Sequence, residues 1–351
     1  MVSGYREKDC RWFRKGFVWI FGVLCLGAPL ADSVAEEVNV YSGRKEALIG
    51  PVLAAFTEET GIQVNLLTGD ADQLRTRLEA EGRNSPADVL LTSDVANLHR
   101  ATAAGLFQEL DSELLEKRIP SRYRDPNGRW YGLSIRARVI AYSIDRVSRT
   151  ELSTYEDLAD ARWKGRVIVR SSSNVYNQSL IASMISAHGT AGAGKWIRGL
   201  VANMARKPQG GDTDQIRAVA AGEADVAIVN SYYYGRLLAS ETDRDRQVVG
   251  SVGMFFPNQD NRGTHVNISG AGVTAHSRNR AEAVFLLEFL SGPVGQKLFA
   301  DLNHEFPVNP EVAPSQIVSD WGSFRADSVP SAKLGEFNGA AVRLADQQGW
   351  R

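Results

Sequence analysis

The stretch from Glu37 to Ser93, EVNVYSGRKEALIGPVLAAFTEETGIQVNLLTGDADQLRTRLEAEGRNSPADVLLTS, decides the fold. Its segments EVNVYS, IQVNLLTG and ADVLLTS are rich in β-branched residues, and LIGPVLAAFTEETG and DQLRTRLEAEG between them have helical patterns. Alternation of this kind is typical of parallel sheets flanked by helices. Because it continues through most of the chain after residue 35, we predict an α/β protein.

Length and charge limit the possible partners. The 351 residues are 43% hydrophobic, which is enough for two lobes with separate cores. The 40 basic side chains nearly balance the 41 acidic ones, so no large basic patch indicates a nucleic-acid partner. We expect a small molecule or a protein as partner instead.

The first 35 residues have the features of a secretory signal peptide. Five basic residues precede the apolar run FVWIFGVLCLGAPLA (Phe17 to Ala31), and small residues at Ser33 and Ala35 suit cleavage after Ala35. A membrane anchor is the weaker alternative, because the run is shorter than the roughly 20 residues that span a bilayer. The sequence therefore predicts a secreted protein whose signal peptide is cleaved.

Both cysteines lie in this predicted signal peptide. A lipid-modified Cys25 is a second alternative, although Leu24 occupies a position where such sites need a small residue. With Cys10 and Cys25 removed, the mature chain has neither a disulfide nor a thiolate ligand.

An internal similarity indicates two lobes built on similar lines. Residues 69–94 and 211–236 share Gly-Asp-x-Asp-Gln-apolar-Arg, a helical stretch and a strand that opens Ala-Asp-Val. Convergent propensity is the alternative, since Asp caps helices and Val favours strands. The segments SIRARVIAYS (134–143) and VGMFFPNQDNRGTHVNISGAGVT (252–274) are the expected hinge strands. The predicted organisation is lobe 1 over 36–138 and 259–302, lobe 2 over 139–258, and a C-terminal helical segment, 303–351, that packs across the lobes.

Four loops are expected to meet in a cleft between the lobes. In open α/β sheets, ligands bind outside the carboxyl ends of the strands, where loops lead into helix N-termini. The loops in question are YSGRKE, TSD, RSSSNVYNQS (170–179) and SYYYGR (231–236).

No enzyme motif is found in the sequence. The five histidines are scattered, and there is no His-Glu-x-x-His, nucleophile elbow, Gly-x-Gly-x-x-Gly or Walker loop. We therefore predict a protein that is not an enzyme and has no histidine-rich metal site.

Tyrosines are the candidate ligands. Tyr232 and Tyr233 are expected at a strand-to-loop junction, with Gly235 permitting a tight turn, and Tyr176 in a Ser/Asn-rich loop before a helix. A free phenol ionises only near pH 10, so phenolates need a highly charged cation, and hard oxygen donors suit ferric iron. The alternative is that these tyrosines are half-buried strand aromatics or stack on an organic ligand.

Several motifs, in order, resemble those of the periplasmic ferric-ion-binding proteins of bacterial ABC iron-uptake systems. They are VYSGRKEALIGPVLAAFTEETGI, NSPADVLLTSDVANLHRATAAGLF, STYEDLADARWKGRVIVRSSSNVYNQSL, GEADVAIVNSYYYGRLL and VGMFFPNQDNRGTHVNISGAGVT, from Val38 to the 300s. This resemblance implies a two-lobed type II periplasmic-binding-protein fold, two α/β lobes joined by two hinge strands. It also implies that Tyr176, Tyr232 and Tyr233 bind Fe(3+), while Tyr234 packs. We expect closure of the lobes to bring Tyr232 and Tyr233 together with Tyr176.

Some positions depart from the family pattern. Lys45 stands where some members have a histidine, Glu46 where others have a further tyrosine, and Ser93 where some have a glutamate. The resemblance is therefore to a tyrosine-dominated subgroup, in which a synergistic anion such as carbonate, or water, completes the shell. Whether Glu46 or Tyr41 joins the metal shell stays open.

For the anion, Arg44 is the first candidate, because a guanidinium binds an oxyanion with a planar fork. Ser173 and Asn174 are expected to add hydroxyl, amide and backbone donors. A salt bridge is the alternative for Arg44. Arg136 and Arg138 are weaker candidates, for which the hinge location favours structural ion pairs.

The predicted function is a monomeric carrier that binds ferric iron in the periplasm and delivers it to an inner-membrane ABC permease and its ATPase. The alternative keeps the fold but changes the solute to a thiamine-like compound, a phosphonate or a polyamine, because fold does not fix the ligand.

Overall fold

A computed structural model of the protein describes residues 36–351. The predicted signal peptide and both cysteines lie outside these residues. Within 36–351, none of the helices has the length and apolar composition needed to cross a membrane.

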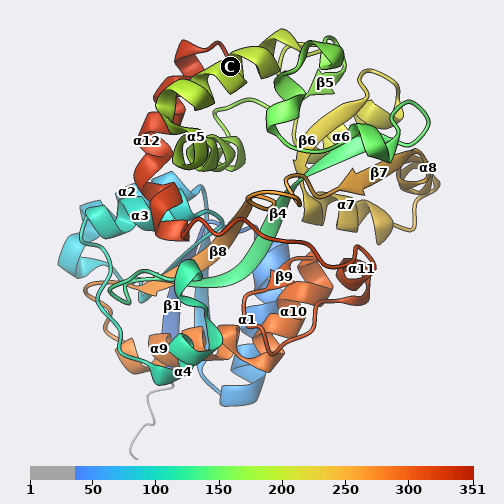
Figure 1. The fold of residues 1–351 in the computed structure, drawn as a ribbon. Coiled ribbons are helices and arrows are strands. Elements are labelled where there is room, and N and C mark those ends of the chain that lie inside the picture. The colour runs from blue at the N-terminus through green and yellow to red at the C-terminus, as the bar shows by residue number, and fades with distance from the viewer. Residues whose placement is uncertain (1–35) are drawn as a thin grey trace, which may run out of the picture. The chain divides into compact units, whose positions relative to one another are not determined.

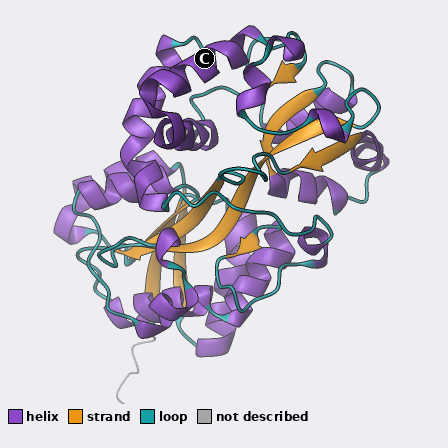
Figure 2. Ribbon diagram, in the orientation of Figure 1, coloured by secondary structure: helices purple, strands orange, loops and turns teal. Residues whose placement is uncertain are grey.

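Nine strands form the sheet, in the order β2-β1-β3-β8-β4-β6-β5 with β7 and β9 also paired with β4. Figure 2 shows the strands in orange and the helices around them in purple. The strands are β1 (Glu37–Ser42), β2 (Gln63–Thr68), β3 (Val89–Thr92), β4 (Tyr131–Ser143), β5 (Val167–Ile168), β6 (Val226–Asn230), β7 (Val252–Phe255), β8 (Val266–Val273) and β9 (Phe306–Pro307). The predicted parallel pairing is found between β1, β2 and β3 and between β5 and β6. The pairs of β4 and β8, which lie in the two segments expected as hinge strands, are antiparallel.

The long strand β4 joins two groups of strands. Its residues Tyr131–Ala137 pair with β8, and Arg138–Tyr142 pair with β6. We call β1, β2, β3, β8 and β9 with the first part of β4 the β8 half, and β5, β6 and β7 with the second part the β6 half. The residue limits of the two lobes stay a prediction.

Helices follow the strands on both faces of the sheet. They are α1 (Glu46–Thr60), α2 (Ala71–Glu81), α3 (Val95–Ala103), α4 (Glu113–Arg118), α5 (Val175–Ala202), α6 (Asp212–Ala220), α7 (Ser231–Leu238), α8 (Asp243–Ser251), α9 (Arg280–Ser291), α10 (Pro293–Asn303), α11 (Gln316–Ser319) and α12 (Ser331–Gln347). The internal similarity corresponds to two helix-then-strand units, α2 with β3 and α6 with β6. Asp70 caps α2 by accepting the backbone N–H groups of Asp72 and Gln73.

The C-terminal helix α12 lies against both α5 and α3 (Figure 1). Close approach to α3 requires Gly335, because a methyl group there would lie 2.5 Å from Cβ of His99. On the other side, Leu344 packs over Gly194 of α5. The segment after α10 thus contacts elements that follow both groups of strands.

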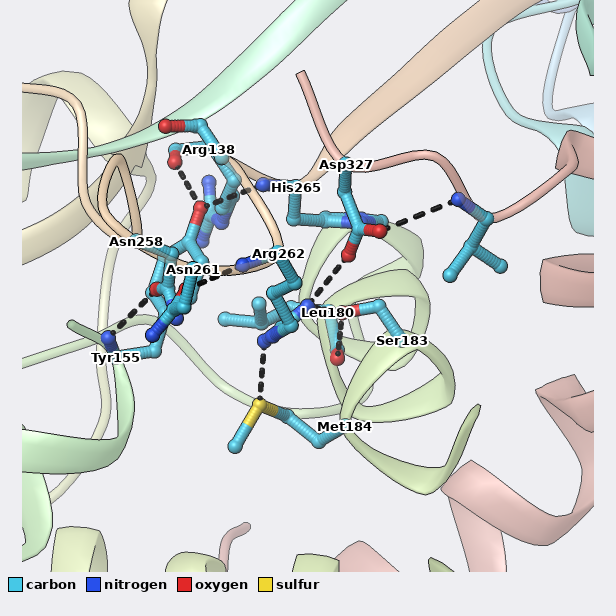
Figure 3. Close-up of polar contacts among 12 residues, drawn as sticks. Arg138, Tyr155, Leu180, Ser183, Met184, Asn258, Asn261, Arg262, His265 and Asp327 are labelled. Carbon is cyan, nitrogen blue, oxygen red and sulfur yellow. Dashed lines mark hydrogen bonds and ion pairs between the residues drawn. The ribbon is translucent and has the colours of Figure 1, made fainter. Parts of the chain in front are cut away.

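The loop between β7 and β8 is fastened to α5 (Figure 3). In this loop, Arg262 donates to Asp327 Oδ2 at 2.5 Å and to the sulfur of Met184 at 2.8 Å. Asn258 accepts the backbone N–H of Tyr155 at 3.0 Å. The start of β8 is therefore held to the helix whose first turn contains Tyr176.

Candidate functional site

The four loops meet, as predicted, around two adjoining hollows. One, which we call the tyrosine pocket, has a volume of about 200 Å³, and the other, the outer chamber, has about 540 Å³. Both are lined by Gly43, Arg44, Lys45, Ser93 and Tyr176. The sequence analysis missed a fifth segment, residues 68–72 after β2, which also lines the outer chamber.

The three candidate tyrosines lie together. The hydroxyl oxygens of Tyr176 and Tyr232 are 3.2 Å apart, and the rings of Tyr232 and Tyr233 have centroids 4.2 Å apart at an interplanar angle of 31°. All three line the tyrosine pocket.

Lobe closure is not what unites these tyrosines, so that expectation is wrong. Helix α5 follows β5 and helix α7 follows β6, and these strands are parallel neighbours with Val167 opposite Val226. The carboxyl ends of parallel neighbours lie at the same edge of a sheet, so both helices begin side by side. The β6 half therefore supplies all three phenols.

The local geometry around Tyr232 differs from the expected strand-to-loop junction. Helix α7 begins at Ser231, directly after β6, so Tyr232 and Tyr233 lie in its first turn. Gly235 makes no tight turn, because it lies within the helix. A methyl group there would lie 2.7 Å from Cβ of His304, so the glycine permits close packing. Tyr234 packs as predicted, and its hydroxyl donates to the carbonyl of Val252 at 2.9 Å.

Burial keeps Tyr232 and Tyr233 neutral. Burial, followed by the neighbouring phenol Tyr176, raises the pKa of Tyr232 well above its usual value. The same causes, joined by the charge of Asp212, raise the pKa of Tyr233 to about 12. At neutral pH and without a cation, Tyr232 and Tyr233 are protonated.

Guanidinium groups surround the rings. The Arg236 guanidinium carbon lies 5.0 Å from the Tyr232 ring centroid and 5.6 Å from that of Tyr233. Those of Arg136 and Arg170 lie 5.7 and 5.6 Å from the Tyr176 ring. Arg136 and Arg236 line the tyrosine pocket, so their positive charge lies beside the tyrosine rings.

The two hinge arginines have different environments. Arg138 forms the expected structural ion pair, with Nη1 at 2.6 Å from Asp212 Oδ2. The same expectation is wrong for Arg136, which donates to the backbone carbonyl of Ser93 and has no carboxylate partner within residues 36–351. Arg136 lines the tyrosine pocket, and its contact with an anion stays a prediction.

Arg44 is paired with a carboxylate that the sequence analysis did not single out. Its Nη1 and Nη2 donate to the two carboxylate oxygens of Glu305, both at 3.0 Å, and Nη1 also donates to Ser269 Oγ at 2.5 Å. The Arg44 side chain still lines both hollows. The salt bridge weighed as its alternative role is therefore present, and its contact with an anion stays a prediction.

The other predicted anion contacts lie at the start of α5. Asn174 caps the helix by accepting the backbone N–H of Tyr176 at 3.0 Å, and Ser173 Oγ lies 2.9 Å from Ser171 Oγ. Ser173 and Asn174 both line the outer chamber, and their contact with an anion also stays a prediction.

Tyr41 and Glu46, whose place in the metal shell the sequence left open, lie away from both hollows. The Tyr41 hydroxyl donates to the carboxylate of Glu81 at 3.0 Å, and Glu46 is exposed in the first turn of α1. Neither lines the tyrosine pocket or the outer chamber. Residues 36–351 also contain no group of three or more His, Cys, Asp or Glu that could hold a metal ion. Tyrosine hydroxyls are thus the candidate donors of this site.

Comparison with known proteins identifies the family of the chain. Residues 84–320 match the sequence family described as bacterial extracellular solute-binding protein. The chain belongs to this family. It is 49% identical over 326 residues to iron uptake protein A1 of Synechocystis sp., covering 92% of this chain and 91% of that protein. The major ferric iron-binding protein of Neisseria meningitidis serogroup B is 29% identical over 94% of this chain and 98% of that protein.

Solved structures of this solute-binding family have the same fold. The Trichodesmium protein in complex with iron and citrate ligands is 47% identical, with a TM-score of 0.87 over 90% of this chain and all of that one. The apo ferric ion-binding protein A of Pasteurella haemolytica is 45% identical, with a TM-score of 0.85 over 90% of this chain and 98% of that one. These likenesses confirm the predicted two-lobed type II periplasmic-binding-protein fold and the resemblance to ferric-binding proteins. The named relatives are described as iron uptake and ferric iron-binding proteins.

Proposed function

We propose that this solute-binding protein binds ferric iron in the periplasm through the phenolates of Tyr176, Tyr232 and Tyr233. In this proposal it delivers the ion, as a monomer and without an enzymatic step, to an inner-membrane ABC permease and its ATPase. One observation carries the proposal, which is the convergence of three phenol groups in a single pocket with the Tyr176 and Tyr232 oxygens 3.2 Å apart. Relatives named for iron uptake and ferric binding support it.

The chemistry of the pocket fits a small trivalent cation. Three phenolates neutralise Fe(3+), and hard oxygen donors match a hard ion. Because the pKa values of Tyr232 and Tyr233 are raised, the ion must displace their protons when it binds. The guanidiniums of Arg136 and Arg236 then offset the charge of an additional oxyanion such as carbonate.

For that anion, we propose the wall of the outer chamber beside Tyr176. Ser173 and Asn174 contribute polar atoms there, at the N-terminus of α5, where the helix dipole favours negative charge. Arg44 contributes its charge from a fixed position, because Glu305 occupies its two terminal nitrogens. Its Nε has no hydrogen-bond partner.

Because one half supplies all three phenols, we propose that the ion binds the β6 half first. The loops of the β8 half that contain Lys45 and Ser93 then close over it. Opening at the permease, with protonation of the phenolates or reduction of the ion, releases it.

Ferric loading of the metal-free protein tests the proposal. Phenolate-to-iron charge transfer gives a visible absorption band, which we expect on titration with ferric citrate and which the double variant Tyr232→Phe, Tyr233→Phe should lose. Tyr234→Phe is the matched control and should keep the band. A protein that stays colourless and takes up no ferric iron contradicts the proposal.

Calorimetry separates the alternative solutes. One face of each ring in the Tyr232 and Tyr233 pair is covered by the other ring, which disfavours stacking of an organic ligand between them. Heat of binding with a thiamine-like compound, a phosphonate or a polyamine, and none with ferric citrate, would favour the alternative.

A further inference from the structure

Asn338 on α12 connects helices from the two halves of the protein. The side chain is 7% exposed. Its Oδ1 accepts from Arg100 Nη1 of α3 at 2.8 Å, and its Nδ2 donates to Gln178 Oε1 of α5 at 3.1 Å. A single carboxamide therefore joins α3, beside the β8 half, to α5, beside the β6 half.

On the α5 side, the connection continues into the loop before Tyr176. Gln178 Nε2 donates to the backbone carbonyls of Ser172 at 3.2 Å and Ser173 at 3.0 Å. Gln178 is itself buried. Asn338 holds the amide oxygen of Gln178, and the loop holds its amide nitrogen. Loss of either hydrogen-bond partner therefore weakens the contact on the other side of the amide.

On the α3 side, the connection reaches the opposite wall of the outer chamber. Arg100 Nη2 donates to Asn97 Oδ1 at 2.5 Å and lies 3.2 Å from Asp72 Oδ1. Asn97 and Asp72 line the outer chamber, as does Ser173 on the other side. The chain of hydrogen bonds thus begins and ends at the walls of the same hollow.

The remainder of the C-terminal segment holds the same loop. Trp350 Nε1 donates to the backbone carbonyl of Arg170 at 3.0 Å, and Ser172 Oγ donates to the carbonyl of Trp350. The Trp350 ring packs edge-on against Trp196 of α5, with centroids 6.1 Å apart. The residues that follow α12 therefore hold the loop 170–174 by two hydrogen bonds and hold α5 by an aromatic contact.

We propose that Asn338 is a positioning residue for the ligand site. When the loops are closed, it fixes the loop 170–174, and with it the phenol of Tyr176, relative to the α2 and α3 wall of the outer chamber. This inference rests on the proposed function, because the ligand it helps to seat is the ferric ion with its oxyanion.

The variant Asn338→Asp breaks one arm of the bridge and keeps the volume. Aspartate still accepts from Arg100, but it cannot donate to Gln178, and its oxygen faces the amide oxygen of Gln178. Without any metal, we expect faster hydrogen exchange at the backbone N–H groups of Tyr176 and Gln178. With ferric citrate, we expect about tenfold weaker binding and a shifted charge-transfer maximum.

Two controls separate positioning from stability and from charge. Gln347→Glu adds the same charge at an exposed site on α12 and should change neither exchange nor the absorption maximum. Leu344→Ala should lower the melting temperature but leave the maximum in place. Gln178→Ala should shift the maximum as Asn338→Asp does, and the two effects should not add.

The results distinguish two kinds of failure. If the unsubstituted protein takes up no ferric iron, the proposed function fails, while the exchange measurement still tests the bridge. If the unsubstituted protein takes up iron, and Asn338→Asp has the same hydrogen-exchange rates, the same ferric affinity and the same absorption maximum, the positioning role is overturned.

Discussion

Arg44 and Glu305, 261 residues apart in the chain, form a two-pronged ion pair with both side chains only 2% exposed. The pair joins the loop after β1 to the segment after α10, at the edge of the tyrosine pocket. The charges of Arg44 and then Arg136, together with hydrogen bonds, keep the pKa of Glu305 below its usual value despite burial. The carboxylate is therefore ionised wherever the protein is folded at neutral pH.

Removing the Glu305 charge should destabilise the protein strongly. In Glu305→Gln, the buried Arg44 guanidinium loses its counter-charge, and we expect the free energy of unfolding in urea to fall by about 3 to 5 kcal/mol. Glu336→Gln is the matched control, because Glu336 pairs with Lys333 on the surface of α12 and both side chains are about half exposed. That change should cost less than about 1 kcal/mol. Equal losses in the two variants would contradict the prediction.

Substitution of Gly235 should displace α7. The added methyl group of Gly235→Ala would lie 2.7 Å from Cβ of His304, and Tyr232 and Tyr233 lie on the same short helix. We expect a loss of about 1 to 3 kcal/mol in thermal or urea unfolding, with weaker ferric binding. Gly250→Ala in α8 is the control, because no neighbouring atom lies within 4 Å there and alanine favours helix. We expect Gly235→Ala to lower the free energy of unfolding and Gly250→Ala to raise it.

Ferric binding should release protons. Because burial raises the pKa values of Tyr232 and Tyr233, both phenols are protonated before binding. About two protons therefore leave this pair for each ion bound, so affinity falls as the pH falls. Calorimetry in buffers of different ionisation enthalpy measures this number, which should drop by about one in Tyr233→Phe. A binding reaction that releases no proton would rule out phenolate ligands.

At alkaline pH, Tyr233 should make the metal-free protein less stable. Its pKa is about 12 in the folded protein and its ordinary value is 10.0. Above pH 10 the unfolded chain loses this proton while the folded protein keeps it, so unfolding is favoured progressively between pH 10 and 12. Urea unfolding across this range should show a shallower pH dependence for Tyr233→Phe than for the unsubstituted protein. Identical slopes would show that Tyr233 contributes nothing to the effect.

By itself, the sequence determined what depends on local chemistry. Alternating β-branched and helical segments located β1, α1, β2, α2 and β3 to within a few residues. The position of SYYYGR directly after a buried strand indicated Tyr232 and Tyr233 as candidates, while the resemblance to ferric-binding proteins assigned Tyr234 to packing. Neighbouring residues set these features, so their pattern is readable along the chain.

Only the tertiary structure decided what depends on contacts between distant segments. The partner of β4 changes from β8 at Arg136 to β6 at Arg138, and Arg136 lies in the tyrosine pocket while Arg138 lies against Asp212. The partnership of Arg44 with Glu305 and the bridge through Asn338 join segments more than 150 residues apart. No local pattern encodes such pairs, because each is selected by the free energy of packing the whole sheet and its helices together.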